Sequence, residues 1–177
     1  MQHHRGGLRT RGGAGPAGAG LSAAAKLAVI VRDVSAESGV PGAARIRKWV
    51  RHAVGDAACG ELGVRIVTTE EMASLNSRYR HKAGPTNVLA FPSGDTPHST
   101  DEPAPLGDLV IAAAVVAREA EAQGKSLEAH WAHIVIHGAL HLIGYDHVTD
   151  HEARVMEDRE RELLAALGFA DPYLVRV

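Results

Sequence analysis

Four short runs of the chain are rich in apolar and β-branched residues, and each run has the length of a strand. Runs of this length and composition predict strands rather than helices. We expect strands at residues 26–34, 61–67, 87–91 and 109–112, with an irregular proline-containing loop at 92–106. The chain up to residue 112 therefore predicts a small sheet of about four strands.

Helical spacing of apolar residues, together with capping residues, predicts about five helices. Thr68 with Glu71 and Thr149 with Glu152 have the spacing of capping boxes, which open helices. Gly144 stands where the helix that contains His137 and His141 is expected to end. The predicted helices cover residues 42–54, 68–78, 113–123, 126–143 and 149–167. Strands come early and helices late without strict alternation, which predicts an α+β fold, with a small mixed sheet packed against the helices.

Length and composition indicate one folded domain behind an N-terminal tail. Residues 1–25 consist mainly of Gly, Ala and Arg without periodicity, so we expect them to be a disordered tail. The remaining residues, 26–177, are long enough for a single domain with a real core. No apolar run reaches about 18 residues, so no membrane-spanning segment is expected.

Charge and cysteine content limit the ways in which this chain could bind a nucleic acid or a metal. Four of the 19 Lys and Arg residues lie in residues 1–26, which contain no acid, so the rest carries 15 against 21 Asp and Glu. Binding of a nucleic acid would therefore need a local basic patch. The single cysteine, Cys59, excludes an internal disulfide and the cysteine-rich zinc sites. Any metal would have to be held by histidines or carboxylates.

The most informative motif is a group of three histidines around a glycine. His137 and His141 are four residues apart, which places them one turn apart on one face of a helix. Gly144 follows where the helix should stop, and a turn there can return His147 to the first two imidazoles. Isolated histidines at such positions would usually be core or surface residues. Three at this spacing predict a metal site with a vacant position, as in catalytic zinc centres.

The spacing of this motif matches that of the metzincin metalloproteases, with one residue changed. In those proteases a glutamate, the general base, follows the first histidine, whereas this chain has Gly138. The metzincin-like histidine helix and glycine turn are thus kept without the protease base. A metalloprotease remains an alternative that Gly138 disfavours.

Two neighbours of the motif have open roles. Asp146 could orient a ligand imidazole, or it could simply form the turn before His147. His133 lies one turn before His137, so it could reach the edge of the site or remain a surface residue.

Residues 78–82, Arg-Tyr-Arg-His-Lys, form the densest basic cluster of the predicted domain. An arginine fork fits a phosphate, and Tyr79 could stack on a base. The same cluster could equally be a solvated helix end, where cations favour the carbonyl terminus. If the cluster binds a substrate, Tyr79 and Lys82 are candidate contacts.

Three segments resemble the signatures of the bacterial YbeY family of rRNA-maturation endoribonucleases. They are residues 75–92 (LNSRYRHKAGPTNVLAFP), 106–111 (LGDLVI) and 129–147 (AHWAHIVIHGALHLIGYDH), and the likeness extends over about residues 27–175. The resemblance implies a cytoplasmic, zinc-dependent, single-strand-specific endoribonuclease. It also implies roles in maturing the 3′ end of the small-subunit 16S rRNA and in ribosome quality control.

Carried over by position, the resemblance implies that His137, His141 and His147 bind one zinc ion per chain. It also implies that Arg80 is the functional arginine, so Arg80 and His137 are the predicted catalytic residues. The expected partners are single-stranded RNA and the small ribosomal subunit with its associated factors, with no membrane and no DNA. The family usually has Asp where this chain has Ala83. A non-catalytic, zinc-bearing ribosome-assembly factor that binds through the basic cluster is the main alternative.

Overall fold

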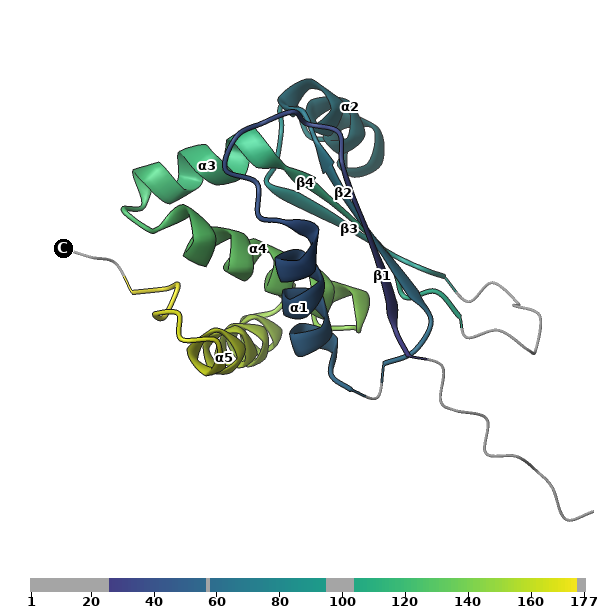
Figure 1. The fold of residues 1–177 in the computed structure, drawn as a ribbon, viewed down its shortest axis with the longest axis vertical. Helices are drawn as coiled ribbons and strands as arrows, with labels where there is room; N and C mark the ends of the chain where they lie inside the picture. Colours follow the sequence, from purple (N-terminus) through teal and green to yellow (C-terminus); the bar gives the residue numbers. More distant parts are fainter. Residues whose placement is uncertain (1–25, 57, 95–103, 175–177) are drawn as a thin grey trace, which may run out of the picture.

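The computed structural model describes residues 26–56, 58–94 and 104–174 (Figure 1). Its four strands are β1 (Ala28–Asp33), β2 (Glu61–Val67), β3 (Val88–Pro92) and β4 (Gly107–Ala112). They form one sheet in the order β1-β2-β4-β3, with β3 antiparallel to β4 and the other neighbours parallel. The tail predicted for residues 1–25 lies outside the described residues.

Five helices are found in the described part of the chain: α1 (Ala43–Val54), α2 (Thr69–Arg80), α3 (Ala113–Ala122), α4 (Leu127–Leu142) and α5 (Asp150–Ala166). Together with the four-stranded mixed sheet they confirm the predicted α+β fold. None of the described helices has the length and apolar character that crossing a membrane requires.

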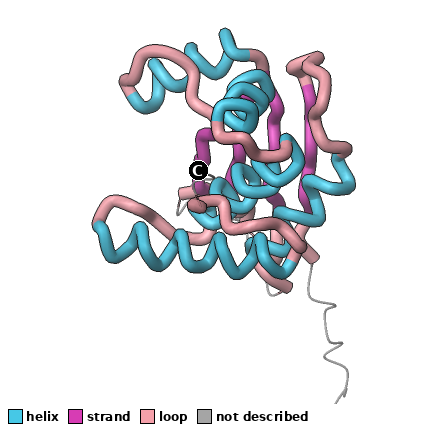
Figure 2. Tube along the Cα trace, turned by 90° about the vertical axis from the view of Figure 1, so that its left-hand side faces the viewer, coloured by secondary structure: helices cyan, strands magenta, loops and turns pink. Residues whose placement is uncertain are grey.

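The sheet has two covered faces, as the alternation along β4 shows. Leu109 and Ile111 point into the larger core, which α1 and α4 share, whereas Val110 and Ala112 point into a smaller core with Met72 of α2. Figure 1 shows α1, α4 and α5 together on one side of the sheet. In Figure 2 the strands run side by side behind these helices.

Helix α4 lies close against the sheet, and its sequence explains how. Trp131 and Val135 are buried, as their helical spacing predicts. A Cβ atom at Gly138 would lie 2.9 Å from Leu109 Cδ2 and 3.2 Å from Val88 Cγ2. Glycine at this position therefore lets the helix approach the strands and leaves no room for a longer side chain.

The end of α2 differs from the sequence-based prediction. The helix was expected to end at residue 78 but continues to Arg80, so Tyr79 and Arg80 lie in its last turn. His81 ends the helix in the left-handed conformation, with φ 56°, and its N–H donates to the carbonyl of Asn76. The Asn76 side chain also donates to the carbonyl of Gly84, at 2.8 Å. These bonds stabilise a helix end that apolar spacing alone does not reveal.

Candidate metal centre

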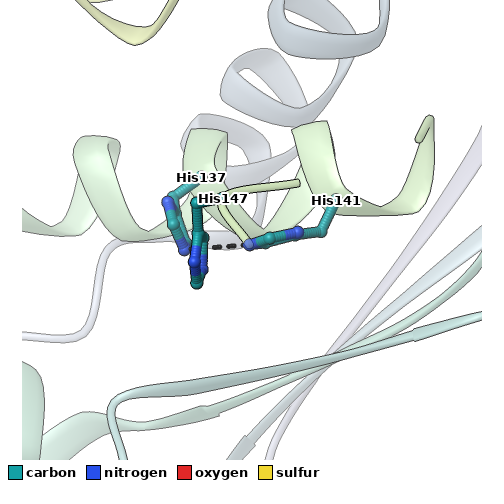
Figure 3. Close-up of side chains that lie close together, drawn as sticks. All are labelled: His137, His141 and His147. Atoms are coloured by element: carbon teal, nitrogen blue, oxygen red, sulfur yellow. Dashed lines mark hydrogen bonds between the residues drawn. The ribbon is translucent and has the colours of Figure 1, made fainter. Parts of the chain in front are cut away.

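The three predicted metal ligands come together at the end of α4. Ser126 caps the helix by accepting from the Ala129 N–H, and the helix carries His137 and His141 on successive turns. Gly144, with φ 97°, turns the chain back, and the loop that follows brings in His147. One ring nitrogen from each of the three histidines lies within 4.8 Å of the others (Figure 3). This arrangement is consistent with a metal site.

Hydrogen bonds behind the two helix imidazoles assign their tautomers. His137 Nδ1 lies 2.7 Å from Glu160 Oε1, and His141 Nδ1 lies 2.9 Å from the carbonyl oxygen of Tyr145. A carboxylate and a carbonyl can only accept, so both Nδ1 atoms carry the proton. Both Nε2 atoms are then left with a lone pair directed into the cluster.

The spacing of these two Nε2 atoms fits a tetrahedral metal. They lie 3.2 Å apart, along the dashed line in Figure 3. Two ligands at the usual Zn–N length in tetrahedral geometry would be about 3.3–3.4 Å apart. Two lone pairs this close repel each other unless a proton or a metal ion lies between them. The donor set therefore fits a bound divalent metal.

The electrostatic surroundings of His141 disfavour a proton between the two Nε2 atoms. Burial lowers the pKa of this imidazole, and the neighbouring His137 and His147 lower it further. The hydrogen bond to Tyr145 and the charge of Asp146 act in the opposite direction but are outweighed. His141 therefore favours the neutral form, which is the form that binds a metal.

Glu160 of α5 contacts the histidine cluster, and the sequence analysis did not single it out. Its side chain is fully buried, and its second oxygen, Oε2, lies 2.9 Å from His133 Nε2 and accepts from the Tyr173 hydroxyl. Burial by itself raises the pKa of this carboxyl. The hydrogen bonds from His133 and His137 outweigh that effect and lower the pKa to about 2. Glu160 is therefore ionised at neutral pH.

A signal for Glu160 is present in the sequence. The buried apolar residues of α5 are Met156, Leu163 and Leu164, and Glu160 occupies the same helical face. A charged residue on the apolar face of an amphipathic helix indicates a buried partner, because unpaired burial of a charge is costly. The identity of that partner could not be read from the spacing.

The structure shows the contacts of His133 and Asp146, the two neighbours of the histidine motif. His133 does not join the three-histidine cluster; its ring is hydrogen bonded to Glu160 and packs against the ring of Tyr173. Asp146 accepts from the backbone N–H of His147 at 2.8 Å, which is a turn-forming bond. Within the described residues, the carboxylate of Asp146 has no hydrogen bond to an imidazole.

The basic cluster lies at the exposed end of α2. Tyr79 packs edge-on against Phe91 of β3, with 5.1 Å between ring centroids. Because α4 also packs against β3, this edge strand is bordered by the end of α2 and by the helix that carries His137 and His141. Among the described residues, the exposed side chains of Arg80 and Lys82 have no hydrogen-bond or ion-pair partner. Both cations are available to an anionic ligand.

Comparison with known proteins decides the family. The family model described as endoribonuclease YbeY matches residues 35–168, which include all three histidines and Glu160. The chain belongs to the endoribonuclease YbeY family. The family resemblance noted in the sequence is thereby confirmed.

Curated relatives with the same description cover most of the chain. The endoribonuclease YbeY of Pseudomonas putida is 54% identical over 138 residues, which are 77% of this chain and 87% of the relative. That of Stenotrophomonas maltophilia is 49% identical over 152 residues, or 84% of this chain and 94% of the relative. The similarity therefore extends over nearly the whole of each relative, not over an isolated motif.

Proposed function

We propose that this protein is a metal-dependent, single-strand-specific endoribonuclease that acts in the cytoplasm on small-subunit rRNA. Its specific tasks would be maturation of the 16S rRNA 3′ end and ribosome quality control, with the small ribosomal subunit and associated factors as partners. The observation that carries the proposal is the histidine cluster, with two lone pairs facing each other in a chain of the endoribonuclease YbeY family.

His137, His141 and His147 would hold a single Zn²⁺ ion. Three neutral imidazoles and a vacant position are the ligand set of a catalytic zinc centre. Zinc bound there would act as a Lewis acid on a phosphoryl oxygen and would activate water near neutral pH.

The other residues would bind and orient the RNA. Arg80 would neutralise negative charge on the scissile phosphate, because its guanidinium is exposed and has no partner among the described residues. Lys82 would contact a neighbouring phosphate, and Tyr79, which is 54% exposed, would stack on an unpaired base. Preference for single strands would follow from this stacking, since bases inside a duplex are not accessible to a side chain.

The packing of α4 supports a nuclease over a protease. Gly138 occupies the position of the zincin glutamate, and a Cβ atom there would already lie too close to Leu109 and Val88, so that side chain has no space. Peptide hydrolysis by the usual zincin route would lack its general base. Activation of water by a metal does not require a carboxylate at this position.

Cleavage of a short single-stranded RNA by purified protein tests the proposal. We expect cleavage that a chelator abolishes and added Zn²⁺ restores, and no cleavage of the same sequence in a duplex. The products of the His137→Ala variant, purified identically, control for contaminating nucleases. Zinc binding without cleavage by the wild type would contradict the proposal and favour the non-catalytic assembly factor.

The ends of the products identify the nucleophile. A 5′-phosphate on the downstream fragment would show that water attacks the phosphorus. A 2′,3′-cyclic phosphate on the upstream fragment would show instead that the RNA 2′-hydroxyl attacks.

A further inference from the structure

Glu160 is a buried charge on the apolar face of α5. Its side chain has 0% exposure, and it lies on the helical face of Met156, Leu163 and Leu164. Transfer of a carboxylate from water to a protein interior is unfavourable unless hydrogen bonds compensate for the lost hydration. An apolar residue would bury the same helical face without that cost, so packing alone does not explain a glutamate here. The groups that contact its carboxylate indicate its role.

Three donors converge on this carboxylate from two other segments. His137 Nδ1 lies 2.7 Å from Oε1, while His133 Nε2 lies 2.9 Å from Oε2, and the Tyr173 hydroxyl donates to Oε2 as well. Because a carboxylate only accepts, it requires the Nδ1–H tautomer of His137. That tautomer leaves Nε2, the nitrogen facing His141, free of a proton.

A second carboxylate–histidine pair, between α3 and α4, provides an internal comparison. His130 Nε2 lies 2.9 Å from Glu119 Oε2, and Glu119 also accepts from the Asn87 side chain. His130 is seven residues before His137 and is not part of the histidine cluster. The two pairs have the same chemistry, but only that of Glu160 includes a predicted metal ligand.

We propose that Glu160 is a positioning residue of the metal centre, which holds His137 in the metal-binding tautomer and orientation. Tyr173 completes this anchor from the C-terminal segment, because its hydroxyl hydrogen-bonds the same carboxylate. The inference rests on the proposed zinc site. It assigns to α5 and Tyr173 an effect on metal affinity although neither contributes a ligand. Such outer hydrogen bonds typically contribute about 10–100-fold to metal affinity.

Zinc affinity of three proteins tests the inference. We would titrate the metal-free wild type, Glu160→Gln and Glu119→Gln with Zn²⁺ against a competing chromophoric chelator. Glu160→Gln should bind zinc about 10–100-fold more weakly. Glu119→Gln, the matched control, should bind as the wild type does. Circular dichroism would establish that each variant is folded.

The ring tautomer provides a second, metal-independent measurement. In metal-free wild type, ¹⁵N chemical shifts should show His137 protonated at Nδ1, and Glu160→Gln should lose this preference. Observation of the Nε2–H tautomer in the wild type would overturn the inference even if Glu160→Gln failed to fold. Unchanged zinc affinity in a folded Glu160→Gln would do the same.

Tyr173→Phe removes one donor and leaves both imidazole contacts in place. It should weaken zinc binding by less than Glu160→Gln, and unchanged affinity would exclude Tyr173 from the anchor. Failure of the wild type to bind zinc would instead overturn the proposed function. The two failures are therefore distinguishable.

Discussion

The metal centre and the basic end of α2 would form the two halves of one active site, but the fold holds them in different ways. At the metal centre, both helix imidazoles have a hydrogen-bond acceptor behind them, Glu160 for His137 and the Tyr145 carbonyl for His141. At the end of α2, the side chains of Arg80 and Lys82 are exposed and have no hydrogen-bond or ion-pair partner among the described residues.

The two halves would therefore contribute in different ways, the metal centre through fixed geometry and the end of α2 through its charge. Metal binding needs ligand atoms at fixed distances, and buried hydrogen bonds supply that order before the metal arrives. Contacts to phosphate act chiefly through charge. Changes at the metal centre should therefore remove function outright, whereas changes at α2 should act on RNA and leave the metal in place.

The largest expected effect is that of His137→Ala. Loss of one of three ligands should abolish both zinc binding and RNA cleavage, because two imidazoles do not hold the metal in the required geometry. Metal analysis after dialysis, run beside the cleavage assay, checks this. Full zinc occupancy in the variant would show that His137 is not a ligand.

The next effect is that of Arg80→Glu. Removal of one group that stabilises transition-state charge commonly costs about 10²–10³-fold in rate, and the introduced negative charge adds repulsion. Zinc content should remain that of the wild type. Arg118→Glu, which makes the same charge change at an exposed site of α3, is the control and should cleave normally. Equal rates for Arg80→Glu and the control would exclude Arg80 from the site.

A smaller effect, on stability, is expected for a substitution at Thr149, where α5 begins. Thr149 accepts from the Glu152 N–H while the Glu152 side chain accepts from the Thr149 N–H, so both halves of a capping box are present. Thr149→Ala should lower the free energy of unfolding by about 1 kcal/mol. Denaturant titration measures this. Because the Glu160 contacts lie elsewhere on α5, zinc affinity should change little, and a large loss would mean that the anchor depends on the helix start.

The most gradual effect is a dependence of stability on pH in the metal-free protein. The pKa of His141 is lowered in the folded state, so the unfolded chain binds more protons between that pKa and the ordinary value of 6.5. Stability contributed by neutral His141 should therefore decline as pH falls below about 6.5. Comparison of the melting temperatures of wild type and His141→Gln between pH 7 and pH 5, in chelator, isolates this contribution. Parallel pH profiles would contradict the assigned direction of the shift.

Local patterns in the sequence accounted for much of the fold and for the ligand candidates. The capping box at Thr149, the Thr68 cap of α2 and the glycine at 144 depend on residues three or four positions apart, so their geometry follows from helix periodicity. At Thr68 only half of the predicted box is present, because the Glu71 carboxylate pairs with Arg65 instead. The same periodicity places His137 and His141 on one face. The end of α2 was predicted too early, because the bonds that extend it to Arg80 come from a helix cap and the Asn76 side chain, not from an apolar pattern.

By itself, the sequence determined the strands, the helices, the histidine spacing and the absence of the zincin glutamate, since each depends on neighbours along the chain. Only the tertiary structure decided the strand order, the close approach at Gly138 and the anchor at Glu160. Glu160 lies 23 residues from His137 and 27 from His133. Contacts at such separations depend on how α5 packs against α4, and helical periodicity reports only which face is buried, not what it meets.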